Sequence, residues 1–230
     1  MLGLPESISA CLFDLDGVLA ETGRLNSRAW AKALSPLFRE HRQPHPSEED
    51  YRRHIDGRPA VDGVRDLLAE RGIAPPDEAL RDLVEEQAVA AFTLIERSGV
   101  PLIRGSLRYL LATVDVGLIR VVVSTDPNTE AVLKSTGLDS MIDAHVDASV
   151  VDKLNLAGKP APDLYLAGAE LVDVPVAQTA VFDDALAGIE AARRGQFAWV
   201  VGLNRIDESH ALALRNRGAD VVVGDLADLL

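Results

Sequence analysis

Hydrophobic residues follow two patterns along the first hundred residues, and each pattern predicts a different element. Residues 10–15 are nearly all apolar and end at Asp16-Gly17, which predicts a strand buried on both faces and closed by a tight turn. Three later segments carry apolar side chains at helical spacing, with charged residues between them: 24–40, 61–71 and 77–97. This part of the chain therefore predicts one strand followed by a helical insertion.

From residue 101 onward, strand patterns alternate with helix patterns. Apolar runs typical of strands lie at 118–123, 179–182, 197–201 and 220–223. Helical patterns lie near 105–115, 128–136, 162–172, 186–194 and 208–217. Such alternation favours a parallel sheet covered by helices, with ligands bound beyond the carboxyl ends of the strands. We therefore expect an α/β core formed by residues 1–20 and 101–230, and a small helical domain at residues 21–100.

Composition and charge restrict the class of protein. The chain has 230 residues, 47% of them hydrophobic, and a formal net charge of −13, so its average field would repel nucleic acid. No apolar run approaches the ~20 residues of a membrane-spanning helix, and the first nine residues contain no Lys or Arg. Cys11 is the only cysteine and lies in an apolar run, which predicts a buried thiol. We expect a cytoplasmic globular protein without nucleic-acid or membrane partners, and a monomer or weak dimer.

Two carboxylates, Asp14 and Asp16, lie at the end of the first predicted strand. In a regular strand both would share one face, but Gly17 permits a turn that moves Asp16 away from Asp14. One carboxylate can attack phosphorus and hold an aspartyl phosphate, while a second moves the proton of the departing or incoming oxygen. We predict Asp14 as the nucleophile and Asp16 as the proton shuttle. Taken alone, the pair is equally compatible with a simple aspartate-rich turn.

Two further segments supply groups that could hold a phosphate. Ser124 and Thr125 follow the strand pattern at 118–123, where Ser124 Oγ and the following backbone N–H groups could bind phosphoryl oxygens. Pro127 next suits the first turn of a helix. Lys159 lies among turn-forming residues before another helix, where a fixed ammonium could neutralise Asp14 and the phosphate. By themselves these segments are a helix cap and a solvated lysine.

Asp183 and Asp184 end the strand pattern at 179–182 with a second carboxylate pair. Magnesium prefers oxygen ligands, commonly one or two carboxylates with waters and a substrate phosphate. We predict a Mg²⁺ site formed by Asp14, Asp183, Asp184 and the backbone carbonyl of Asp16. Without a cation, these aspartates and a phosphate dianion would repel one another.

These four segments resemble the haloacid dehalogenase-like phosphotransferases. Three stretches look most like the β-phosphoglucomutase-type branch: FDLDGVLAET, GKPAPD and VFDDALAGIEAA. The resemblance covers essentially the whole chain, and four motifs in the right order are far more specific than any one of them. It implies a Rossmann-like core and a helical cap at residues 21–100, with hinges at 21–22 and 97–101. It also implies substrate contacts from Gly17, Thr125 and Asn128, and we add Arg28 and Arg58 as candidate substrate contacts from the cap.

The chain departs from the mutase pattern at three positions. Asn26 stands where the mutase usually has a histidine, Ala60 where it has a cap arginine, and Pro127 where it has a lysine. Arg28, Arg58 or Arg65 could compensate for the missing cations. A mutase must grip a bisphosphate at both ends and keep water from the phosphoaspartate, so these losses weaken that interpretation.

The leading hypothesis is a phosphatase or phosphomutase that acts on small phosphorylated metabolites, with sugar phosphates as the expected class. A β-phosphoglucomutase that interconverts β-glucose 1-phosphate and glucose 6-phosphate is the alternative. A hypothesis of another class is a non-catalytic module that binds a phosphorylated ligand, although binding alone needs no nucleophile and proton shuttle. Dehalogenation of a haloacid is a further option, but it needs neither Asp16 nor a magnesium cluster.

Overall fold

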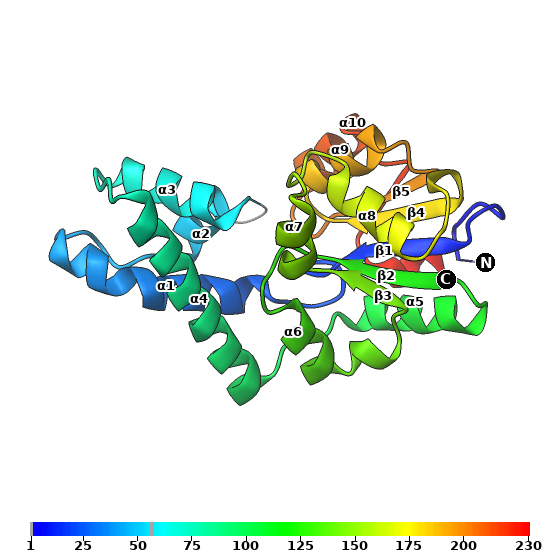
Figure 1. The fold of residues 1–230 in the computed structure, drawn as a ribbon. Helices are drawn as coiled ribbons and strands as arrows, with labels where there is room; N and C mark the ends of the chain where they lie inside the picture. Colours follow the sequence, from blue (N-terminus) through cyan, green and yellow to red (C-terminus); the bar gives the residue numbers. More distant parts are fainter. Residues whose placement is uncertain (1, 56–57) are drawn as a thin grey trace. The chain divides into compact units, whose positions relative to one another are not determined.

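The computed structural model describes residues 2–55 and 58–230 and divides the chain into two compact units. The larger unit consists of Met1–Glu21 and Pro101–Leu230, and the smaller unit of Thr22–Val100. The smaller unit is therefore an insertion in the chain after the first strand (Figure 1).

In the described part of the larger unit, six parallel strands form one sheet in the order β3-β2-β1-β4-β5-β6. Their bounds are Ala10–Asp14 (β1), Ile119–Val123 (β2), Ala144–Val146 (β3), Thr179–Asp183 (β4), Trp199–Leu203 (β5) and Val221–Val223 (β6). The first strand lies between β2 and β4, near the middle of the sheet. This arrangement confirms the predicted α/β class with a Rossmann-like parallel sheet.

Six α-helices connect or follow these strands in the described part of the larger unit. Their bounds are Arg104–Asp115 (α5), Thr129–Thr136 (α6), Ala148–Leu154 (α7), Asp163–Leu171 (α8), Leu186–Arg194 (α9) and Glu208–Asn216 (α10). Short 3₁₀ segments lie at Leu138–Ser140, Val176–Gln178 and Leu226–Leu229. Figure 1 shows α8 and α9 on one face of the sheet and α5 on the other.

Side chains of the central strands alternate between two apolar layers. Leu12 belongs to a buried cluster that contains side chains of α8 and α9. The next residue, Phe13, stacks on Phe182 with ring centroids 4.5 Å apart, and both rings contact Tyr109 of α5. Both faces of the strand are therefore apolar, which explains why the sequence shows a continuous hydrophobic run there. Cys11 is buried, as predicted, and burial raises its pKa to about 12.

The smaller unit contains four helices and no strand among its described residues, in agreement with the predicted helical insertion. The helices are Gly23–Glu40 (α1), Glu48–His54 (α2), Ala60–Glu70 (α3) and Asp77–Ser98 (α4). Trp30, Leu34 and Phe38 of α1 share a buried cluster with Leu67 and Leu68 of α3. No helix in the described part of the chain is both long and apolar enough to cross a membrane.

Three short elements were not predicted from the sequence. The strand β3 has only three residues and pairs with β2 alone, so it shows too little of a hydrophobic pattern. The helices α2 and α7 have seven residues each, and both are stabilised by hydrogen bonds at their first turn. The predicted place of Pro127 in the first turn of a helix was wrong, because α6 begins at Thr129 and Pro127 precedes it. The strand predicted at 197–201 lies two residues later, at Trp199–Leu203.

Candidate active site

The central strands end side by side at the carboxyl edge of the sheet. Asp14, the last residue of β1, pairs with Val123 of β2, and Ser124 follows directly. On the other side, β4 ends at Asp183, one position beyond its last residue paired with β1. The parallel register therefore places three of the four predicted segments at one edge of the sheet, through Asp14, Ser124 and Asp183.

The ammonium group of Lys159 links Asp14 to Asp183. Its Nζ donates hydrogen bonds to Asp14 Oδ1 and to Asp183 Oδ2, the second at 2.7 Å. Burial alone would lower the pKa of Lys159, but the charges of the two carboxylates outweigh burial and raise that pKa well above its ordinary value. Lys159 is therefore a fixed cation between the two strand ends.

The carboxylate of Asp183 is fully buried and accepts three hydrogen bonds. Its Oδ2 accepts from Lys159 Nζ and from the Tyr165 hydroxyl, and its Oδ1 accepts from the Ala185 N–H at 2.8 Å. Burial and the charge of Asp183 raise the pKa of Tyr165 well above its ordinary value, so the hydroxyl keeps its proton. Tyr165 lies outside the residues that the sequence analysis singled out. A signal for its role was available, because a buried tyrosine hydroxyl requires a hydrogen-bond partner.

Asp14, Asp183 and Asp184 form an acidic cluster, with one oxygen from each lying within 4.8 Å of the others. Gly17 lies against this cluster, because a Cβ added there would be 2.0 Å from Asp184 Oδ2. Gly17 also has a φ of +70°, which favours glycine. An all-oxygen donor set of this kind fits a hard divalent cation such as Mg²⁺. The side chain of Asp16 is outside the described cluster.

Burial of Asp14 makes its negative charge unfavourable. Desolvation raises the pKa of Asp14 to about 7, and the nearby charges of Asp183 and Asp16 act in the same direction, while Lys159 opposes them. A carboxylate must be ionised to attack phosphorus. Lys159 alone therefore leaves the charged form of Asp14 only partly favoured near neutral pH, and a bound cation would favour it further.

The turn after β2 has fewer available donors than the sequence suggested. The Ser124 N–H donates to Val146 O at 2.9 Å, the Asp126 N–H to Ser124 Oγ at 3.1 Å, and the Asn128 N–H to Asp126 Oδ1 at 2.7 Å. These backbone groups organise the turn itself. Among the described groups of this turn, the hydroxyls of Ser124 and Thr125 and the N–H of Thr125 are not donors in these bonds and could bind a phosphate.

The remaining predicted substrate residues have different surroundings. Asn128 is buried before α6. Arg28 and Arg58 belong to the smaller unit, where Arg58 donates to Asp66 at 2.8 Å. Arg28 is exposed and makes no ion pair in the described part of the chain. Of these two arginines, Arg28 is therefore the one whose charge is not already paired.

Two residues outside the predicted segments also contact this edge of the sheet. Arg205, in the loop between β5 and α10, donates from Nη1 to the carbonyl of Gly17. His210, in the first turn of α10, has its Nε2 3.0 Å from the carbonyl oxygen of Asp184. Both contacts are to backbone oxygens, so no motif of side chains in the sequence could have indicated them.

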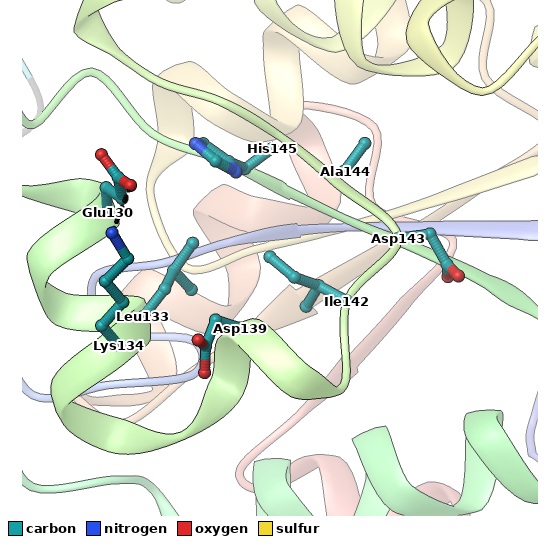
Figure 2. Close-up of a pocket in the computed structure, with 8 residues that line it drawn as sticks. All are labelled: Glu130, Leu133, Lys134, Asp139, Ile142, Asp143, Ala144 and His145. Atoms are coloured by element: carbon teal, nitrogen blue, oxygen red, sulfur yellow. Dashed lines mark hydrogen bonds and ion pairs between the residues drawn. The ribbon is translucent and has the colours of Figure 1, made fainter.

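A separate hollow lies beside α6 and β3 (Figure 2). Its lining includes Glu130, Asp139 and Asp143. Lys134 also lines it and pairs with Glu130 at 2.5 Å. None of the predicted site residues is among the described residues that line it. Because Asp14, Asp16 and Lys159 are not among its described lining residues, this hollow does not mark the predicted phosphoryl-transfer site.

Comparison with known proteins agrees with this geometry. A family model for haloacid dehalogenase-like hydrolases matches residues 8–196. A β-phosphoglucomutase of Mycobacterium bovis is 42% identical and aligns with 100% of this chain and 94% of its own. A validoxylamine A 7'-phosphate phosphatase of Streptomyces hygroscopicus subsp. limoneus is 30% identical over 95% of this chain and 94% of its own.

Among solved structures, CbbY from Rhodobacter sphaeroides in complex with phosphate has the same fold. Its TM-score is 0.80 at 24% identity, with 96% of both chains covered. The resemblance drawn from the four motifs is thereby confirmed, and the chain belongs to the haloacid dehalogenase-like hydrolase family of enzymes.

Proposed function

We propose that this chain catalyses magnesium-dependent phosphoryl transfer on small phosphorylated sugars, through an aspartyl phosphate on Asp14. The observation that carries the proposal is the position of Lys159, whose ammonium bonds both Asp14 and Asp183 beside the acidic cluster. A cation fixed at a buried carboxylate lowers the repulsion between that carboxylate and an incoming phosphate.

The reaction would take two steps. In the first, an oxygen of Asp14 bonds to phosphorus while the bond from phosphorus to the ester oxygen breaks, and Asp16 gives a proton to the departing oxygen. In the second, Asp16 takes a proton from water or a sugar hydroxyl, whose oxygen bonds to phosphorus as the bond to Asp14 breaks. Ser124, Thr125 and Lys159 hold the phosphoryl oxygens in both steps.

Asp14 and Asp184, with the backbone carbonyl of Asp16, would hold the metal ion. Asp183 already accepts three protein hydrogen bonds, so its proposed part is to orient Lys159 and add negative charge near the ion. When bound, magnesium supplies positive charge that offsets the carboxylates and the phosphate.

The smaller unit is proposed to act as a cap that selects the substrate and excludes water, with hinges at 21–22 and 97–101. Arg28, one of the exposed arginines of this unit, is the proposed contact for a second charged group of the substrate. Relatives named as acting on phosphorylated carbohydrates support a sugar phosphate. We further propose a cytoplasmic enzyme that is a monomer or weak dimer, with no nucleic-acid partner because its net charge is −13.

The test is release of phosphate from a generic ester with and without magnesium, together with trapping of the phosphoenzyme. Asp14→Asn should abolish both signals, because a neutral amide cannot attack phosphorus. Asp115→Asn removes an exposed carboxylate at the end of α5 and should change neither. Turnover that survives Asp14→Asn in a clean preparation would show that the nucleophile is another group.

The second candidate is a β-phosphoglucomutase, which the relative at 42% identity over the full chain favours. Asn26, Ala60 and Pro127 stand where the mutase pattern has a histidine and two cations, which favours hydrolysis instead. The structure shows that Asn26 is buried and accepts a hydrogen bond from Gln87 at 3.3 Å.

Incubation with β-glucose 1-phosphate and a trace of bisphosphate separates the two candidates. Glucose 6-phosphate as the product identifies a mutase, whereas free glucose and inorganic phosphate identify a phosphatase. Tight binding of phosphate esters without release or phosphoenzyme would instead indicate a non-catalytic module.

A further inference from the structure

The loop between β5 and α10 fixes the turn that follows the proposed nucleophile. Arg205 donates to the carbonyl oxygen of Gly17, and the N–H of Gly17 donates to Ala20 O at 3.0 Å. The two peptide groups that flank Gly17 are therefore each held by one hydrogen bond. A glycine with a φ of +70° has many alternative conformations, so these bonds select one of them.

Fixing these peptide groups also orients Asp16. Because a trans peptide is planar, the carbonyl of Asp16 points opposite to the Gly17 N–H that Ala20 holds. That carbonyl is a proposed metal ligand, and the side chain on the same residue is the proposed proton shuttle. The contact from Arg205 holds the next peptide group and so limits rotation about Gly17.

The same loop and helix hold the segment after β4. The acceptor of the His210 contact is a carbonyl oxygen, so His210 Nε2 is the donor, at 3.0 Å from Asp184 O. The N–H of the same peptide group, on Ala185, donates to Asp183 Oδ1 at 2.8 Å. This peptide plane is therefore fixed at both ends, next to the side chain of Asp184.

The loop is itself organised by local hydrogen bonds. Asp207 caps α10 by accepting from the His210 N–H at 2.9 Å. Asn204 accepts from the Ile206 N–H at 3.2 Å and donates to Asp207 O at 2.9 Å. A loop held in this way can present Arg205 and His210 without first being ordered by a ligand.

We propose that Arg205 and His210 are positioning residues that hold Asp16 and Asp184 at the spacing the proposed metal site requires. The inference rests on the proposed function. The two contacts hold neighbouring segments, because Gly17 lies against the Asp184 carboxylate. In the described part of the chain Arg205 makes no ion pair, so its role is not that of a surface salt bridge.

The test compares Arg205→Ala and His210→Ala with Arg215→Ala, a control on the exposed face of α10 whose ion partner lies 3.8 Å away. Loss of groups that orient metal ligands typically costs about 10- to 100-fold in metal affinity or activity. We expect both test variants to bind Mg²⁺ at least about tenfold more weakly by calorimetric titration. Their kcat should fall while the KM for the ester changes little, and the control should match the wild type.

Conservative variants separate positioning from folding. Arg205→Lys and His210→Gln keep a donor and should recover part of the lost metal affinity, which general destabilisation would not do. If His210→Ala melts at a lower temperature than the wild type, the Mg²⁺ affinity of His210→Gln is compared with that of the control instead. Equal Mg²⁺ affinity in the alanine variants and the control overturns the inference, whatever the rates.

The inference and the proposed function fail in different ways. A wild-type protein that transfers no phosphoryl group refutes the proposed function, while the calorimetric titration still decides the role of Arg205 and His210. A wild-type enzyme with normal turnover whose alanine variants match the control refutes only the inference.

Discussion

Replacing Asp14 by asparagine should stabilise the metal-free protein at alkaline pH while it removes activity. The Asp14 side chain is only 14% exposed, and burial raises its pKa from 3.8 to about 7. The folded state therefore binds this proton more tightly than the unfolded state does. The associated stability is present below pH 3.8 and is lost as the pH rises through about 7.

The size of the effect follows from the two pKa values. The difference between 3.8 and about 7 corresponds to about 4 kcal/mol, at about 1.4 kcal/mol per pKa unit. Roughly 3 kcal/mol of this stability is lost between about pH 5 and about pH 8. The amide introduced by Asp14→Asn does not titrate. The unfolding free energy of this variant minus that of the wild type should therefore increase by this amount over that interval.

Urea unfolding of both proteins at the two pH values, with EDTA present, measures the difference. Other titrating groups and the changed contact of Lys159 contribute similarly at each pH and cancel to first order in the comparison. Saturating magnesium should stabilise the wild type at the higher pH, because it binds the folded state with Asp14 ionised. If the difference in unfolding free energy between the variant and the wild type were the same at both pH values, the argument that burial opposes the charge of Asp14 would be refuted.

Three further substitutions test the contacts around the acidic cluster. Lys159→Met leaves two carboxylates without their shared cation, so we expect lost activity and destabilisation of about 3–5 kcal/mol by urea unfolding. A stability equal to that of the wild type would contradict this. Tyr165→Phe removes one of three donors to Asp183 and should cost about 1–3 kcal/mol, with the buried ring retained. An unchanged unfolding curve would mean that this hydrogen bond contributes nothing. Gly17→Ala places a methyl group 2.0 Å from Asp184 Oδ2 at a φ of +70°, and should weaken magnesium binding measured by calorimetry. Magnesium binding as tight as in the wild type would show that the turn can move away.

The sequence was sufficient to predict the layers of the fold. Long apolar runs gave the central strands, because a strand covered by helices on both faces has no polar side to interrupt the run. The three-residue β3 and the seven-residue α2 and α7 were missed, because so few residues show no periodicity. Their stability comes from pairing with β2 and from hydrogen bonds at the helix starts, which depend on three-dimensional neighbours.

The sequence by itself also indicated the side chains proposed to carry the chemistry, since Asp14, Asp16, Lys159 and Asp184 lie in motifs that resemble those of the matching family. Only the tertiary structure decided how they meet. The order of the strands places β1 between β2 and β4, and this brings residues more than a hundred positions apart to one edge. Contacts made to backbone groups, such as that of Arg205, leave no pattern in the sequence, because every residue offers the same carbonyl oxygen.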